Sequence, residues 1–463
     1  MTTQEQPPPV AGSTAANSPG AAGAAGAAGV GTDLADTDTG ETEVVAASVS
    51  AAPELIVGSL QEYLQAQWRR IKGGESGVLP ILAGLVVIIV IFQVKESKFL
   101  SAGNIVNLFV QAAVFVLLGL AEIFALLLSE IDLSTGYVAA VGAFIIAELI
   151  AAPNNWPWWL GVIGGLAVTA AIGLVHGILI TRLHLPSFVV TLAGLLGWQG
   201  VMIFLADVDK TAVGGVIRIS VKSPVFKLVN SNMSPTLSWI LLAVLLVLFA
   251  AVTVPRAARR RARGLSAPPP SITILTIVVT AIAGILLVFI CNLNRGVGLV
   301  ALRGVPWVVP FVLVVVVAWS VLLGKTRLGR YIYAIGANPE AARRAGINVA
   351  WVRTIAFMLC SLTAGMAGLV YESRLGSMAT DIDGGTLVLY AVAAAVIGGT
   401  SLFGGRGKAI HALLGGIVIA AVYNGLGLIG IHAAGQDIAT ALVLLAAVTV
   451  DSLVRRRGSP GVA

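Results

Sequence analysis

Acidic side chains occur within or beside long apolar runs of this chain, where they could help a polar solute to cross a membrane. An ionisable group near the bilayer centre costs about 2.5–3.5 kcal/mol and usually faces the bundle interior or a water-filled path. The acids in such positions are Glu122, Glu130, Asp132, Glu148, Asp381 and Asp383. These residues are therefore candidates for lining a route through the protein.

Two of these acids lie in similar sequence contexts. The dipeptide Ile-Asp occurs at 131–132, before a Gly- and Ala-rich run beginning at Thr135, and again at 382–383, before a comparable run beginning at Thr386. The two copies are expected to cross the membrane in opposite senses, as an inverted repeat requires. Only two residues match, so a chance coincidence is the alternative interpretation.

Motifs for nucleotide binding and catalysis are incomplete. The triplet 324–326 (Gly-Lys-Thr) could end a phosphate-binding loop, but Trp319 stands where its first glycine belongs. The dipeptide 407–408 (Gly-Lys) lacks that glycine too, and Ala409 replaces the Ser or Thr that would hold magnesium. There is no GxSxG turn, and the histidines have no ligand spacing such as i, i+4. We therefore expect no enzyme activity, metal or cofactor in this chain, and any ATP and magnesium would be bound by a separate ATPase.

The segment 325–353 contains a short predicted helix. Asn338 and Pro339 form a start signal, and Gly346 can end the helix after barely two turns. Between these signals, Glu340 lies near the helix N-terminus, and Ala341 and Ala342 are small. Arg343 and Arg344 follow, and we expect both to project toward acidic neighbours. A helix this short is not stable alone in water. The segment is either a docking piece for a partner protein or an ordinary capped turn.

Composition places these residues in a membrane protein. Of the 463 residues, 57% are hydrophobic and only 11% charged, whereas soluble proteins carry about 25% charged residues. The net charge of +7 resides in short loops, where membrane orientation explains it better than nucleic-acid binding does. Cys291 and Cys360 lie in apolar stretches, which excludes a disulfide-stapled secreted fold.

The chain divides by composition into four parts. Residues 1–53 form an acidic, Ala- and Gly-rich tail that we expect to be disordered. Residues 54–76 carry apolar side chains at helical spacing and predict an amphipathic helix, lying either on the membrane surface or on the protein itself. Residues 77–455 form the membrane domain, and 456–463 a short cytoplasmic tail.

Apolar runs long enough to cross a bilayer predict an all-α bundle of about 10–12 spans. The candidates are 78–94, 105–128, 133–152, 157–180, 187–206, 237–254, 271–291, 306–324, 354–371, 386–403, 409–430 and 436–454. With the N-terminus inside, most of the 29 Lys and Arg residues fall on inside segments, which favours cytoplasmic termini. The breaks near 129–134 and 398–407 could be loops or half-membrane kinks.

Five stretches together resemble the membrane permeases of ribose- and xylose-type ATP-binding cassette (ABC) importers. They follow the order of that family over most of residues 80–455 and are 130–136 (EIDLSTG), 185–194 (LPSFVVTLAG), 329–349 (GRYIYAIGANPEAARRAGINV), 397–407 (IGGTSLFGGRG) and 424–430 (NGLGLIG). The resemblance implies a permease homodimer in the cell membrane, two cytoplasmic ATPase subunits and an extracytoplasmic sugar-binding protein. It also implies that the helix at 340–346 is the ATPase-coupling helix.

One departure from the shorter ribose-type pattern bears on the substrate. The region 207–306 adds two predicted spans and the basic loop PRAARRRARG, and in this it resembles xylose-type members. The resemblance therefore implies a monosaccharide permease, with a pentose such as xylose as the expected substrate. Candidate path residues are Glu130, Asp132, Ser134, Asp383, Thr400 and Asn424, each of which could instead make a structural interhelical hydrogen bond.

Two other classes of protein remain as alternatives. An ion-coupled secondary transporter of a small polar solute would use Glu122, Glu148 or Asp132 as relay groups. A membrane-embedded enzyme of lipid or sugar transfer would present clustered acids or metal ligands at the interface, and the interfacial cluster here is basic.

Overall fold

The computed structural model describes residues 79–208, 215–264, 267–296, 301–379, 382–432, 434–442, 445 and 449. All of these residues belong to one compact unit of the chain. The predicted tail, the predicted amphipathic helix and the end of the chain lie outside the described residues.

The described part is almost entirely helical. Its helices are α2 (Leu79–Lys95), α3 (Ala102–Leu126), α4 (Thr135–Ile150), α5 (Trp158–Arg182), α6 (Ser187–Val208), α7 (Pro224–Asn230), α8 (Pro235–Ala262), α9 (Pro270–Asn292), α10 (Val308–Lys325), α11 (Arg327–Ala337), α12 (Pro339–Arg344), α13 (Val349–Leu375), α14 (Gly384–Ile397) and α15 (Ala409–Leu428). Two short strands, β1 (Val216–Arg218) and β2 (Ser377–Ala379), pair antiparallel.

The helices confirm the predicted polytopic bundle. Eight described helices are long and apolar enough to cross a membrane, and three shorter apolar helices, α2, α4 and α14, accompany them. These eleven helices correspond to eleven of the twelve predicted spans. The twelfth, 436–454, lies mostly outside the described residues.

Helix α3 forms the centre of the bundle. It is almost wholly buried, and α13, α14 and α15 pack around it. Small residues permit the close contacts: a Cβ atom on Gly416 of α15 would lie 2.6 Å from a Val116 methyl of α3. A larger residue at that position would therefore force α3 and α15 apart.

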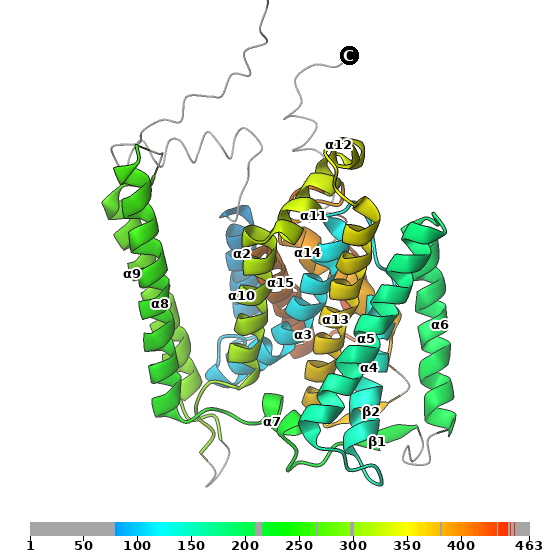
Figure 1. Cartoon of the computed structure of the whole chain (residues 1–463). Coiled ribbons are helices and arrows are strands. Elements are labelled where there is room, and N and C mark those ends of the chain that lie inside the picture. The colour runs from blue at the N-terminus through cyan, green and yellow to red at the C-terminus, as the bar shows by residue number, and fades with distance from the viewer. Residues whose placement is uncertain are drawn as a thin grey trace, which may run out of the picture. The chain divides into compact units, whose positions relative to one another are not determined.

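The two ends of the bundle differ in structure (Figure 1). Helices α11 and α12 lie at one end, called here the α12 end, and α7 and the β1–β2 pair lie at the other, called the α7 end. At the α7 end the Ser373 hydroxyl, near the end of α13, donates to the Val225 carbonyl of α7 at 2.5 Å. This bond helps to fix α7 over that end.

Helices α4 and α14 are too short to cross a bilayer alone. At 1.5 Å per residue they span about 24 and 21 Å, against about 30 Å of hydrocarbon. Each follows a non-helical segment: the first break (127–134) enters from the α12 end, and the second break, of which 376–379 and 382–383 are described, enters from the α7 end. Of the two alternatives for the stretch near 129–134, a loop or a half-membrane kink, the structure thus favours the kink.

The starts of α4 and α14 touch. A Cβ atom on Gly136 would lie 1.9 Å from the Gly384 carbonyl oxygen, and one on Gly384 would lie 2.6 Å from the Tyr137 ring. Two broken segments thus enter from opposite ends and meet within the bundle, the arrangement of an inverted repeat.

Helices α8 and α9 form a pair beside the bundle (Figure 1). They are the two additional spans expected in the region 207–306. Only 6% of the apolar stretch of α8 and 11% of that of α9 is buried. A small cluster that includes Val106, Met233, Val288 and Cys291 ties the pair to the bundle. Most of its apolar surface is therefore free to contact lipid.

Candidate coupling helix and solute path

Helix α12 forms where the sequence predicts it. The Asn338 side chain caps it by accepting from the Ala341 amide at 2.9 Å, Pro339 occupies its first turn, and Gly346 has a φ of +81° just beyond it. Ala342 is buried, whereas Glu340 and Ala341 are exposed. Within the described part of the chain, the one buried side chain of α12 is therefore that of Ala342, and the other face of the helix is exposed.

The two arginines of α12 are exposed, and both also have an acidic partner on the same helix. Arg343 and Arg344 pair with Glu340, at 2.9 and 3.3 Å. Spacings of three and four residues bring these side chains to one helix face. Exposed pairs of this kind are worth at most about 1 kcal/mol. A partner with acidic groups could therefore replace Glu340 at little cost.

The Gly-rich loop (398–408) connects α11 to the first break. The Tyr333 hydroxyl of α11 donates to the Gly407 carbonyl at 2.7 Å, and the Gly405 amide donates to the Leu127 carbonyl at 2.9 Å. The Ser129 hydroxyl donates to the Phe403 carbonyl at 2.8 Å. The three segments are thus bonded in series, from the helix before α12 to the first break.

One sequence feature of this connection is the Gly-Gly pair of the loop. Gly404 and Gly405 have φ values of +79° and +67°, conformations that favour glycine. Thr400 of the same loop, a predicted path residue, is buried, and its hydroxyl has no hydrogen-bond partner among the described residues. A Cβ atom added to Gly407 would lie 3.1 Å from this hydroxyl oxygen.

Glu130 joins the same end of the molecule. Its carboxylate pairs with Arg353, in the first turns of α13, at 3.2 Å. The side chains are only 13% and 29% exposed, so the pair is better shielded than the pairs of α12. Glu130 was predicted on the solute path, and the structure shows that it binds the first break to the base of α13.

Asp132 and Ser134 lie in a buried polar chain. Asp132 accepts from the Ser134 amide at 3.0 Å and from the Ser134 hydroxyl at 2.6 Å. The Ser134 oxygen lies 3.4 Å from Nδ1 of His176 on α5, and Nε2 of that ring accepts from the Trp198 indole of α6 at 3.0 Å. This chain connects the first break to α5 and α6. Sequence reasoning found Asp132 and Ser134 but assigned no role to His176 or Trp198.

Glu122 lies beside this chain without a basic partner. It is fully buried and accepts from the Thr135 hydroxyl at 2.8 Å, while its second oxygen has no partner in the described part of the chain. Glu148, at the far end of α4, accepts from the Asn154 side chain at 2.9 Å. Of the acids predicted inside spans, only Glu122 is thus close to the first break.

Asp383 caps α14. Its carboxylate accepts from the Thr386 amide at 3.0 Å and from the Thr386 hydroxyl at 2.5 Å. The side chain is exposed, unlike that of Asp132. The predicted candidate Asp381 lies outside the described residues.

Asn424 makes an interhelical hydrogen bond. Its side-chain oxygen accepts from Asn104 of α3 at 2.8 Å, and the same Asn104 amide also donates to the Phe99 carbonyl. Both asparagines are buried. The structural alternative to a path role therefore accounts for the contacts of Asn424.

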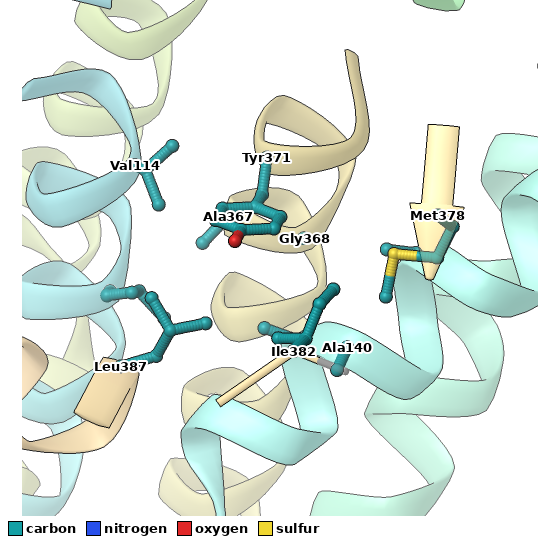
Figure 2. A pocket seen from close by; sticks show the side chains of 11 residues that line it. Val114, Ala140, Ala367, Gly368, Tyr371, Met378, Ile382 and Leu387 are labelled. Carbon is teal, nitrogen blue, oxygen red and sulfur yellow. The ribbon is translucent and has the colours of Figure 1, made fainter. Parts of the chain in front are cut away.

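A small cavity lies between α3, α4, α13, β2 and the start of α14 (Figure 2). Its volume is about 10 Å³, about the space of one water molecule. Figure 2 shows Tyr371, Ile382, Leu387 and Met378 around it, and the surface that lines the cavity is apolar. The cavity therefore has no room for a solute larger than water, and it forms no open route in this conformation.

No set of three potential His, Cys, Asp or Glu metal ligands comes together within the described ranges. The described residues instead show a set of contacts that could transmit movement. An exposed helix at one end is bonded, through the Gly-rich loop and the Glu130–Arg353 pair, to a broken segment that reaches the centre.

Comparison with known proteins places this arrangement among transporters. The family described as "Branched-chain amino acid transport system / permease component" matches residues 104–450. The xylose transport system permease protein XylH of Escherichia coli K12 is 31% identical over 395 residues, covering 83% of this chain and 96% of that protein. No solved structure matches the chain.

Two further relatives from the same organism carry other sugar names. The D-allose transport system permease protein AlsC is 29% identical and covers 80% of this chain and 90% of its own length. The ribose import permease protein RbsC is also 29% identical, covering 80% of this chain and 92% of its own length.

Proposed function

Because the chain belongs to the branched-chain amino acid transport system / permease component family, we propose that it is the permease subunit of an ABC importer for a monosaccharide. The relatives named for xylose, allose and ribose transport support the substrate class. The observation that carries the mechanism is the exposed face of α12, together with the hydrogen bond that connects the preceding helix, α11, to the Gly-rich loop.

The proposed substrate is a pentose such as xylose. The relative named for xylose is slightly more similar than those named for allose and ribose, and the α8–α9 pair fits the xylose-type pattern of the sequence. Uptake of labelled xylose, ribose and allose by cells that express the complete importer tests this choice. Saturable uptake of xylose at the lowest concentration is expected, and a preference for allose would overturn the pentose assignment.

The α12 end is proposed to face the cytoplasm. Basic side chains concentrate there, as the positive-inside rule requires of the cytoplasmic side; they include the arginines at the end of α8 and those of α11 and α12. Two ATPase subunits would contact α12 in a permease homodimer, and a sugar-binding protein would deliver substrate at the α7 end. ATP and magnesium would be bound by the ATPase, so this subunit would perform no covalent chemistry.

Movement would reach the path in three steps. Closure of the ATPase on ATP shifts α12 and α11. The Gly-rich loop, held by Tyr333 and by the backbone of Leu127, and the Glu130–Arg353 pair then displace the first break. The start of α4 separates from the start of α14, and the closed region between them opens alternately to each side.

Reconstitution tests this mechanism against the ion-coupled alternative. Proteoliposomes that contain the chain alone, or the chain with its ATPase and binding protein, are loaded and assayed for sugar uptake. Uptake that requires ATP and the ATPase is expected. Gradient-driven uptake by the chain alone would show that buried acids such as Glu122 and Asp132 act as ion relays and would overturn the importer proposal.

A further inference from the structure

The end of α8 concentrates positive charge beyond its apolar stretch. It carries Arg256, Arg259, Arg260, Arg261 and Arg263. The preceding residues, 235–254, contain no charged side chain and span about 30 Å at 1.5 Å per residue, the thickness of the hydrocarbon core. The arginines therefore begin where the headgroups of one leaflet begin.

One face of this end is concave. Pro255 interrupts the helix interior, and the hollow beside it has a volume of about 480 Å³. Apolar residues line its membrane side and arginines its outer side: Ala251, Val252, Pro255, Arg256, Arg259, Arg260 and Arg263. Arg256, Arg259 and Arg263 lie at helical spacings that bring them to the same side of α8.

Arg261 is the one arginine of this end that does not line the hollow. Its guanidinium donates to the Pro268 carbonyl and to the Thr273 hydroxyl, both at 3.2 Å, and so joins α8 to the start of α9. In contrast, no carboxylate of the described residues forms an ion pair with Arg256, Arg259 or Arg263. Three cations thus face the hollow without neutralisation from the described part of the protein.

We propose that this face binds the headgroup of an anionic phospholipid. Helix α8 is almost entirely exposed along its apolar stretch, so acyl chains surround it up to the hollow. The apolar inner side of the hollow suits the upper part of an acyl chain, and guanidinium groups bind phosphate oxygens in pairs. Basic clusters next to a membrane span attract anionic lipids. This site is independent of the transport activity proposed above.

Lipid binding to the full-length protein in detergent tests the proposal. Native mass spectrometry would compare retention of phosphatidylglycerol and phosphatidylcholine by the wild type and by Arg256→Gln/Arg259→Gln/Arg263→Gln. Each basic residue near an anionic surface contributes about a fivefold gain in affinity. The triple variant should therefore bind phosphatidylglycerol roughly 100-fold more weakly, with phosphatidylcholine unchanged.

A matched variant separates this site from general electrostatic attraction. Arg455→Gln/Arg456→Gln/Arg457→Gln removes the same charge from another segment and should retain the wild-type preference for phosphatidylglycerol. Equal losses in the two triple variants, or no preference in the wild type, would overturn the proposal. Displacement of the lipid by millimolar inorganic phosphate would also overturn it, since the site would then be one for free anions.

A second substitution keeps every arginine and addresses misfolding of the triple variant. Val252 is 53% exposed and lines the hollow four residues before Arg256. Val252→Glu would place a carboxylate among the arginines and should abolish the preference for phosphatidylglycerol. Wild-type binding by a Val252→Glu protein that elutes as a single species would contradict the proposed site.

Discussion

At the scale of single residues, the acids of the first break have different partners and different expected roles. Glu130 forms a shielded ion pair with Arg353, whereas Asp132 bonds to Ser134 within a buried polar chain. Only one residue separates them in sequence. Charge and spacing identified both, but the identity of their partners depends on how α5 and α13 pack, which no local pattern reveals.

The Glu130–Arg353 pair should transmit movement. Either Glu130→Arg or Arg353→Glu would place like charges together in a partly buried position, where loss of a pair typically costs about 3–5 kcal/mol. Sugar uptake by the complete importer should fall at least tenfold in each single variant. The double variant Glu130→Arg/Arg353→Glu should recover a substantial part of it. Failure of the double variant to improve on both single variants, at equal expression, would argue against the pair as a link.

Asp383 should contribute to stability as the N-cap of α14. Asp383→Ala should destabilise the protein by about 1 kcal/mol, as loss of a helix cap does. Thermal unfolding in detergent should show a lower melting temperature for the variant than for the wild type. Equal melting temperatures of the two proteins would contradict this assignment.

At the scale of elements, α12 shows what the sequence predicts well and what it does not. Asn338, Pro339 and Gly346 predicted both ends of the helix, because capping depends on neighbouring residues. The same reasoning missed the pairing of both arginines with Glu340 and the hydrogen bond between Tyr333 of α11 and Gly407 of the Gly-rich loop. That hydrogen bond joins residues 74 positions apart.

Disruption of α12 should uncouple the proposed subunits. In Glu340→Arg/Gly346→Pro, the first change leaves Arg343 and Arg344 beside a third cation, and the second forces a negative φ at a position that has +81°. The variant should lose most of its association with the ATPase, measured by co-purification, and its stimulation of ATP hydrolysis. Lys222→Glu, at the α7 end, is the control and should preserve both. Normal association of the α12 variant would refute the assignment of the coupling helix.

The contact between α4 and α14 should tolerate no added atom. The methyl group in Gly136→Ala would overlap the Gly384 carbonyl, and such overpacking typically costs about 1–3 kcal/mol. Gly197→Ala in α6, where nothing lies within 4 Å of the added carbon, is the matched control. Thermal unfolding in detergent should show a lower melting temperature for Gly136→Ala and no decrease for Gly197→Ala. Equal melting temperatures would show that the two helix starts are not in tight contact.

At the scale of the whole molecule, hydropathy predicted a membrane protein and the positions of eleven described apolar helices. This succeeds because each span must form all its backbone hydrogen bonds within itself and present apolar side chains around them. Hydropathy left a loop or a kink open for two breaks; the structure has a kink near 129–134 and a loop at the α12 end near 398–407. Hydropathy could not reveal that the two broken segments touch, since that contact depends on packing between distant parts of the chain.

The meeting of α4 and α14 also bears on leakage. Its closest approach involves the main chain of both helices, at Gly136 and Gly384, so rotation of the neighbouring Tyr137 ring alone cannot part the helices and admit a proton or sodium ion. Parting the two requires a helix to shift as a body, which is slower and rarer than a rotamer change. Between turnovers, a cell would thus keep its membrane potential despite housing many copies of the importer.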